Sequence, residues 1–232
     1  MKKKKPALLP PSYDIYDALT QVHRDGICTE TREIWLHSTH AGDEEPGVEY
    51  RMATMFLKNL NLLEKNGRLP IIVHMHVTGG EWNDGMAIYD AIKLSSCPIT
   101  IIAYAQASSM SGIILQAAKT RLMMPNCEFM AHSGSLDTNN ETRVALKIAQ
   151  RNMDGHYQML KIFAERCVKS DKYKDFTVEQ VCSKLDWWMK DEGEINILGS
   201  EAVAHGFADA LIGSVEYPTV YDAWGRIMSS SS

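Results

Sequence analysis

Two residue types with the chemistry of a hydrolytic site, serine and histidine, each stand at the end of an apolar run. Ser108 and Ser109 come soon after "CPITIIAYA", and His132 closes "EFMAH". A serine hydroxyl becomes an effective nucleophile when a histidine removes its proton and an acidic group orients that histidine. An unpartnered hydroxyl in apolar surroundings costs about 1–3 kcal/mol. The serines therefore either cap a helix, the simpler role for Ser108, or include a nucleophile at a strand-to-helix turn.

Strands alternate with helices along the chain, which predicts an α/β fold with a parallel sheet in right-handed βαβ units. The apolar patterns predict strands at 31–38, 69–77, 97–105, 120–124 and 128–132, and helices at 48–66, 84–96, 110–119, 138–167 and 177–185. Asp84 is placed to cap the second helix. Sites in such sheets collect at the carboxyl ends of strands, where Gly79-Gly80, Ser108-Ser109 and His132 all fall.

The helix predicted at 138–167 is long for a chain of 232 residues. It carries one apolar stripe and few other apolar residues, so we expect it to protrude or to pack against another subunit. We find no internal repeat and no linker that would split the chain.

Composition excludes several classes of function. The net charge is −5, so nothing indicates a nucleic-acid partner. No apolar span of 18 residues occurs, so we expect no membrane helix. Lys2–Lys5 opens the chain without the apolar stretch of a secretion signal, and we expect a solvated arm there. The five cysteines are widely spaced without a CxxC pair, which favours a reducing cytoplasm over disulfides or zinc.

Four segments occur in a telling order: "TGGEWNDGMAIYDAI", "AQASSMSG", "MPNCEFMAH" and "SEAVAHGFAD". They resemble four blocks of the Clp protease proteolytic subunit family. That family has a Ser-Pro-Gly-Gly turn before a helix with Ile-Tyr-Asp, then Gly-Gln-Ala-Ala-Ser-Met. Pro-Asn-Ser with an apolar pair and His follows, and then Ser-Ala-Glu-Glu-Ala with Gly-Leu-Asp. The resemblance covers about Arg32 to Ile212 and implies the fold that Clp proteases share with crotonases.

The resemblance implies a role for each matching position. Ser109 matches the nucleophile and His132 the general base. The backbone N–H groups of Gly80 and Met110 match the donors to the oxyanion. Counting back from Glu201-Ala202 puts Glu194 where the family has its triad aspartate, with Asp191 and Glu192 as alternatives.

The resemblance also implies substrates and partners. Polypeptide substrates would bind as an extended strand along Gly80, Glu81, Trp82, Ser133, Gly134 and Ser135. Family members form homo-oligomeric rings, typically of seven subunits and often stacked in pairs. An AAA+ unfoldase feeds the chamber, and because no GxxxxGK[ST] loop occurs here, that ATPase would be a separate chain. No cofactor is implied. We expect an N-terminal arm (1–30), a peptidase domain (31–215) and a C-terminal tail (216–232).

Several positions depart from the family pattern. Ser111 replaces a glycine or alanine, and Thr78 replaces the proline before the two glycines. These departures indicate a divergent, phage-type branch. Two alternatives stay open: a crotonase-like enzyme acting on acyl-thioesters, and a non-catalytic ring subunit. His74 and His76 alternate on one strand face, but no third metal ligand is evident.

Overall fold

The computed structural model describes residues 19–36, 47–134 and 140–229. The Lys2–Lys5 segment, most of the predicted N-terminal arm and Ser135 lie outside these ranges. Residues 19–30 of that arm contain a helical turn, η1 (Gln21–Asp25), and a short strand, β1 (Ile27–Cys28), that joins the sheet.

The described strands form one sheet in which β1 to β5 lie in chain order, followed by β8. Their bounds are β1 (Ile27–Cys28), β2 (Glu33–Leu36), β3 (Ile71–Val77), β4 (Ile99–Ser108), β5 (Thr120–Met123), β6 (Glu128–His132), β7 (Glu194–Leu198) and β8 (Ala210–Leu211). The α/β prediction is confirmed, and the centre of the sheet is parallel. Two antiparallel pairs, β1–β2 and β6–β7, were not expected. The connection from β1 to β2 is too short for a parallel crossover.

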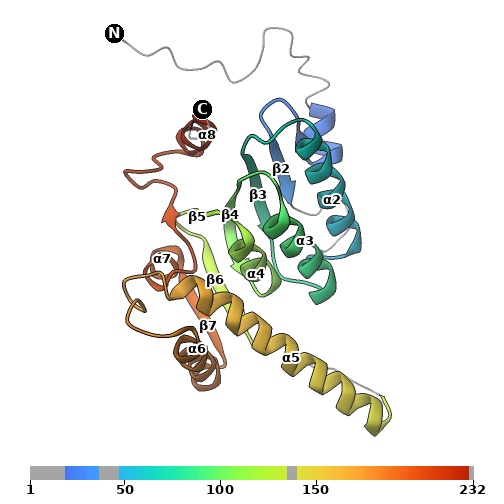
Figure 1. Ribbon diagram of the computed structural model, residues 1–232, viewed down its shortest axis with the longest axis vertical. Helices are drawn as coiled ribbons and strands as arrows, with labels where there is room; N and C mark the ends of the chain where they lie inside the picture. Colours follow the sequence, from blue (N-terminus) through green and yellow to red (C-terminus); the bar gives the residue numbers. More distant parts are fainter. Residues whose placement is uncertain (1–18, 37–46, 135–139, 230–232) are drawn as a thin grey trace.

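Helices cover both faces of the sheet (Figure 1). They are α2 (Tyr50–Lys65), α3 (Trp82–Leu94), α4 (Met110–Ala117), α5 (Thr142–Cys167), α6 (Val178–Glu192), α7 (Gly199–His205) and α8 (Val220–Ser229). Helices α2, α3 and α4 lie on one side and α8 on the other. The N-terminal part of α5 extends away from the sheet, and its buried residues begin only at His156, so the predicted protrusion is present.

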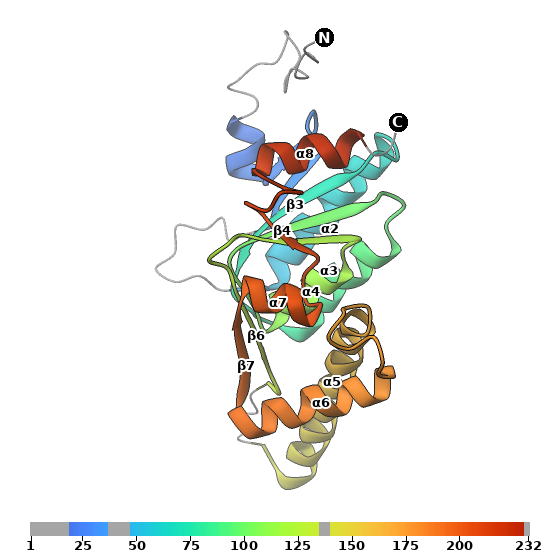
Figure 2. The same cartoon turned by 90° about the vertical axis from the view of Figure 1, so that its left-hand side faces the viewer.

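The strand β4 divides its pairing between two neighbours, and this division creates the platform for the site. Its first half pairs with β5, whereas Gln106 to Ser108 pair with β6. Strands β6 and β7 therefore run past the main sheet toward α5 and α6 (Figure 2). The carboxyl ends of β4 and β6 consequently lie side by side.

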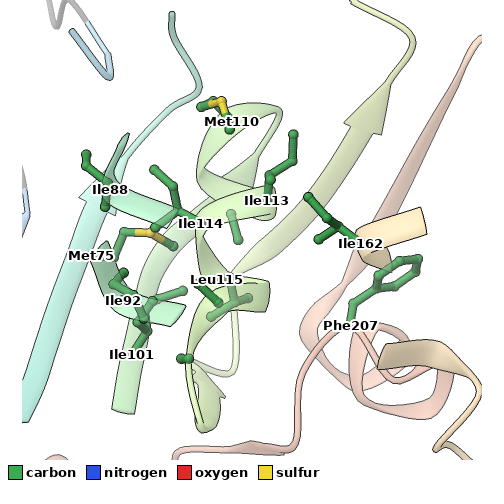
Figure 3. Close-up of a cluster of buried hydrophobic side chains, with 14 of the residues drawn as sticks. Met75, Ile88, Ile92, Ile101, Met110, Ile113, Ile114, Leu115, Ile162 and Phe207 are labelled. Atoms are coloured by element: carbon green, nitrogen blue, oxygen red, sulfur yellow. The ribbon is translucent and has the colours of Figure 1, made fainter. Parts of the chain in front are cut away.

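The core encloses α4, and all eight residues of this helix are buried. A helix that is buried on every side must be enclosed by its neighbours. Figure 3 shows how: Met75 of β3, Ile88 and Ile92 of α3, and Ile162 of α5 converge on it. Burial on this scale holds the first residue of α4 in place.

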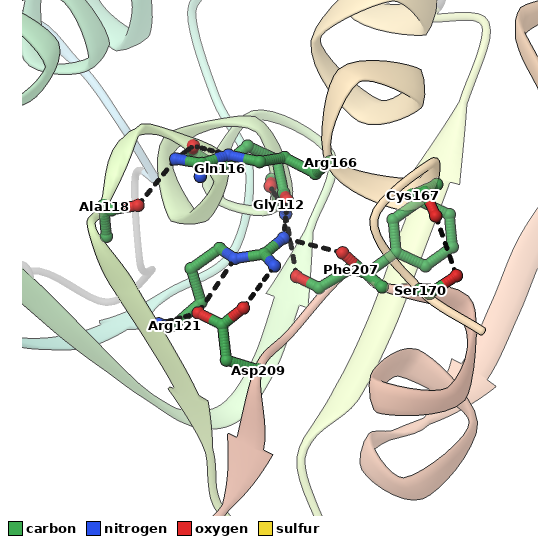
Figure 4. A network of polar contacts seen from close by, with 10 residues as sticks. Gly112, Gln116, Ala118, Arg121, Arg166, Cys167, Ser170, Phe207 and Asp209 are labelled. Carbon is green, nitrogen blue, oxygen red and sulfur yellow. Dashed lines mark hydrogen bonds and ion pairs between the residues drawn. The ribbon is translucent and has the colours of Figure 1, made fainter. Parts of the chain in front are cut away.

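A polar network fixes the other end of α4 (Figure 4). Arg121 is 4% exposed, and its side chain donates to Gln116 Oε1 and Gly206 O, both at 2.7 Å, besides pairing with Asp209. Arg166 of α5 donates to the carbonyl of Gln116 at 2.8 Å. The network thus ties α4, α5 and the start of β8 together, and it sets where α5 lies relative to the site.

Two details differ from expectation. Asp84 does not cap α3, because the helix begins earlier, with Glu81 at the N-cap and Asp84 in the first turn. A backbone bond from Glu81 N–H to Val48 O, 2.8 Å, fixes the chain before Asp84 is reached. The segment expected as a tail carries α8, whose Ala223 and Ile227 pack against the outer face of the sheet. The domain boundaries themselves stay predictions.

The turn between β4 and α4 is braced by a buried hydroxyl. Ser111 Oγ accepts a hydrogen bond from Ser108 N–H at 2.8 Å and donates to Ser108 O at 2.9 Å. Ser111 is fully buried. This brace gives a physical reason for serine at a position where the family pattern has glycine or alanine.

We expect Ser111→Ala to lower the free energy of unfolding by about 1–3 kcal/mol, because it leaves the buried N–H of Ser108 without an acceptor. Urea denaturation followed by tryptophan fluorescence measures the change. The matched control is Ser183→Ala, an exposed hydroxyl bonded to its own helix, which should change stability by less than about 0.5 kcal/mol. Equal effects for the two variants would contradict the bracing role.

His205 is a buried base held in its neutral form. Lys172 Nζ contacts its Nε2, and Tyr173 Oη lies 2.9 Å from its Nδ1. Because an ammonium can only donate, Nε2 accepts and Nδ1 carries the ring proton. Burial, with the charge of Lys172, lowers the pKa of His205 from 6.5 to about 4.

The lowered pKa of His205 predicts that the folded protein loses stability in acid. Between about pH 6.5 and pH 4 the unfolded chain binds a proton at His205 that the folded chain does not, so stability is full above this window and falls through it. The loss from this residue should reach about 3 kcal/mol. Thermal denaturation across the window should show a flatter pH dependence for His205→Gln than for the parent chain. The exposed control His23→Gln should keep the parent slope; a parent-like slope in His205→Gln would refute the assignment.

Candidate active site

Ser109 occupies a strained backbone conformation at the end of β4. Its φ is 53° and ψ is −121°, and only Arg32 and Ala105 share a positive φ among the described non-glycine residues. Its N–H donates to Met130 O of β6 at 2.8 Å. Such strain persists where the surrounding structure enforces it, often at functional sites. Here it projects the serine from a sharp strand-to-helix turn.

Gly79 makes this turn possible, although the sequence analysis placed both glycines at the strand end and assigned a catalytic role only to Gly80. A Cβ on Gly79 would lie 2.6 Å from Ser109 Cβ and 2.9 Å from its Oγ. No side chain fits there. The Gly-Gly pair in the sequence was the available signal, because a side chain at Gly79 would clash with Ser109 and one at Gly80 would clash with the Val48 backbone.

The structure brings Ser109 and His132 together. Ser109 Oγ and His132 Nε2 are 2.8 Å apart, although the residues are 23 positions apart in the chain. The parallel pairing of β4 with β6 produces this meeting. For the hydroxyl to donate to Nε2, the neutral ring must carry its proton on Nδ1. This is the arrangement that general-base activation of a serine requires.

Glu194 lies opposite His132, but its carboxylate is hydrogen-bonded elsewhere. The two residues are directly opposed in the antiparallel pairing of β6 with β7. The Glu194 carboxylate instead accepts a hydrogen bond from Asn196 Nδ2 at 3.1 Å. Within the described residues, no ion pair of 4.0 Å or less joins a carboxylate to His132. The alternatives Asp191 and Glu192 are exposed in the last turn of α6.

The backbone around Gly80 leaves an N–H group available. Val48 N–H donates to Gly79 O at 2.6 Å, and Glu81 N–H donates to Val48 O at 2.8 Å. Gly80 stands between them with φ of 143°, and a Cβ there would overlap the Val48 backbone. In the described parts of the chain, the N–H of Gly80 donates to no protein acceptor.

Met110 supplies a second such N–H group as the first residue of α4. The N–H groups of a first helical turn lack intrahelical acceptors, and the positive end of the helix dipole lies there. Over the same described ranges, the Met110 N–H has no protein acceptor. The position of a Cβ on Gly79 would be 3.3 Å from Met110 N, so the glycine pair and this amide adjoin.

A cavity of about 650 Å³ opens beside Ser109 and His132. It is lined by five of the predicted substrate-binding residues: Gly80, Glu81, Trp82, Ser133 and Gly134. The sixth, Ser135, lies outside the described residues. The volume is within the range of small-ligand sites, about 300–1,000 Å³.

Sequence reasoning missed the opposite wall, which comes from α5. The lining residues of this helix include Ile148, Arg151, Gly155, His156 and Met159. A Cβ on Gly155 would lie 3.6 Å from the Trp82 ring, and Arg151 donates to Asn83 Oδ1 at 3.3 Å. The helical spacing of 148, 152, 155 and 159 was the available signal. Only the folded chain reveals that this stripe faces α3.

His156 is anchored behind this wall. Its Nε2 lies 2.9 Å from Asp186 Oδ1 of α6, and Asp186 also pairs with Lys190. Burial opposes ionisation of Asp186, but the hydrogen bonds from Lys190 and His156 prevail and lower its pKa. Because the carboxylate only accepts, His156 Nε2 carries a proton. The pair locks α5 to α6.

The described residues contain no group of three His, Cys, Asp or Glu side chains that could hold a metal ion. His74 has other partners: Glu33 Oε1 at 2.8 Å, Tyr104 Oη at 2.9 Å and the stacked ring of Trp35. Nor does any helix in these ranges have the length and apolar character needed to cross a membrane.

The chain is similar to known proteins. The Clp protease family profile matches residues 44–214. An ATP-dependent Clp protease proteolytic subunit of Deinococcus radiodurans is 27% identical over 139 residues, which span 56% of this chain and 68% of that protein. A protein of the same description from Carsonella ruddii is 31% identical over 87 residues, or 37% of this chain and 45% of that protein. With three quarters of its length inside the family profile, this chain belongs to the Clp protease family.

Proposed function

We propose that this protein is a serine endopeptidase that cleaves polypeptides through an acyl-enzyme. The observation that carries the proposal is the 2.8 Å contact between Ser109 Oγ and His132 Nε2 at a strained turn. Membership of a protease family supports it. Two backbone N–H groups that have no acceptor among the described residues, on Gly80 and Met110, adjoin the same turn.

In this mechanism Ser109 Oγ attacks the scissile carbonyl while His132 Nε2 takes its proton. The C=O π bond opens, and the oxygen gains negative charge that the N–H groups of Gly80 and Met110 stabilise. Collapse of this intermediate breaks the C–N bond, and His132 returns the proton to the leaving amine. Water, activated by the same histidine, then hydrolyses the ester on Ser109.

We assign the third catalytic position to Glu194. It is the carboxylate directly opposite His132 across β6 and β7. A side-chain rotation that brings it to Nδ1 would stabilise the imidazolium that forms during attack. Asp191 and Glu192 precede β7, and the register of β6 with β7 pairs neither of them with His132.

The substrate would bind as an extended strand along Gly80 to Trp82 and Ser133 to Ser135. We further propose that the chain assembles into heptameric rings, stacked in pairs, in the cytoplasm. A separate AAA+ unfoldase would supply unfolded polypeptide. These assignments rest on family membership and on the names of the relatives, two of which are called ATP-dependent.

The nucleophile can be tested with a fluorophosphonate probe and a fluorogenic peptide. Ser109→Ala should abolish labelling and lower kcat/KM by about 10⁴-fold or more. Ser108→Ala is the matched control, because its hydroxyl bonds Gln106 rather than His132, and it should label normally. Absent labelling in the parent chain would refute the peptidase; acyl-CoA turnover instead would indicate a crotonase-like enzyme, and no turnover of either kind a non-catalytic ring subunit.

The base can be tested through pH. Protonation of His132 removes its ability to accept the Ser109 proton, so kcat/KM should be lower at the acid end of a profile recorded from about pH 8 to pH 5. Peptide hydrolysis at constant ionic strength measures the profile, with thermal stability recorded at each pH to separate unfolding. A flat profile over this range would contradict His132 as the base.

A further inference from the structure

Asn196 holds the carboxylate that the proposed mechanism requires. Its Nδ2 donates to Glu194 Oε1 at 3.1 Å, within the same strand β7. Residues two apart on a strand share a face, and the burial of β7 follows this alternation: Glu194, Asn196 and Leu198 are exposed, whereas Ile195 and Ile197 are buried. The side-chain amide of Asn196 therefore lies next to Glu194, because both residues are on the same face of β7.

His132 is the other neighbour of the same carboxylate. It pairs directly with Glu194, while Asn196 pairs with Met130, the next residue of β6 on that face. Opposed residues have Cβ atoms about 4.5–5.5 Å apart. A glutamate side chain spans that gap by rotation about its own bonds, without any backbone movement. The carboxylate thus has two donors within reach: the Asn196 amide and the Nδ1–H of His132.

We propose that Asn196 is a positioning residue that competes with His132 for the Glu194 carboxylate. This competition limits how well Glu194 can support the reaction of Ser109 with His132. The inference rests on the proposed function. With Glu194 on Asn196, the imidazolium formed during attack lacks its counter-ion. With Glu194 on His132, a charge-assisted hydrogen bond stabilises that imidazolium. Each turnover therefore begins by breaking the Asn196–Glu194 bond.

Other charged groups near His132 do not make this competition. The same cavity is lined by Glu81 at the N-cap of α3 and by Arg151, Asp154 and His156 of α5. Glu128 lies on the face of β6 that carries His132, opposite Leu198. Among the described residues, none of these forms an ion pair with His132. The electrostatic effect of these charged groups on His132 is the same whichever donor binds Glu194. It therefore cancels when the parent chain is compared with the Asn196 variants.

The first experiment measures peptide hydrolysis by full-length Asn196→Ala. Releasing Glu194 from a single exposed hydrogen bond should raise kcat by about two- to tenfold with KM little changed. The acid limb of the pH profile should move to higher pH, because the carboxylate stabilises protonated His132. Asn196→Gln, which keeps an amide donor, should return toward parent values. Leu198→Ala, on the same exposed face, is the matched control and should change neither quantity.

The second experiment uses Glu194→Gln, in which the competed carboxylate is absent. Adding Asn196→Ala to this variant should have no effect on kcat or on the pH profile. An equal rise with and without Glu194, or no rise in Asn196→Ala alone, would overturn the competition.

A third readout keeps the inference separate from the proposed function. NMR of the His132 ring needs no turnover, and the pH at which this ring protonates should rise in Asn196→Ala but not in the double variant with Glu194→Gln. Should Ser109 prove unreactive while this shift appears, the peptidase proposal fails and the competition stands. If Ser109 reacts but the pH at which His132 protonates does not change in Asn196→Ala, the competition fails and the peptidase proposal stands.

Discussion

The arrangement of the site depends on one backbone constraint, the positive φ of Ser109. A non-glycine residue adopts this conformation at an energetic cost, so the surroundings must enforce it. Three features of the structure do so. Met130 O accepts a hydrogen bond from the Ser109 N–H, and Ser111 holds the backbone of Ser108. Gly79 has no side chain, which leaves room for Ser109. The buried helix α4 anchors the other side of the turn. Without this conformation the hydroxyl would not face His132.

The divided pairing of β4 is the second determinant. One long strand serves the main sheet with its first half and β6 with its last residues. It thereby places the ends of β4 and β6 side by side, and β7 then adds Glu194 opposite His132. The same division leaves β6 and β7 extended toward α5, which closes the cavity. A single topological feature thus joins Ser109, His132 and Glu194 to the cavity that α5 lines.

Much of the fold could be predicted from periodicity. The strands around Ile71–Val77 and Ile99–Ser108 and the long α5 were expected close to their observed positions, because apolar patterns report burial directly. The antiparallel pairing of β7 and the packing of α8 were not expected. Polar and apolar residues alternate in β7, but nothing local says which strand it joins. Asp84 was misjudged as a cap because the chain is fixed earlier by Val48, a residue 36 positions away.

The sequence by itself determined which side chains are available for chemistry: a serine after one apolar strand, a histidine at the end of another, and glycines where backbone must approach closely. It could do so because strand ends and glycine positions follow from local patterns. Only the tertiary structure decided that Ser109 Oγ meets His132 Nε2, that Gly79 is the glycine packed against the serine, and that Glu194 is held by Asn196. These depend on distances of a few ångströms between segments far apart in the chain, set by strand pairing and core packing that no local pattern encodes.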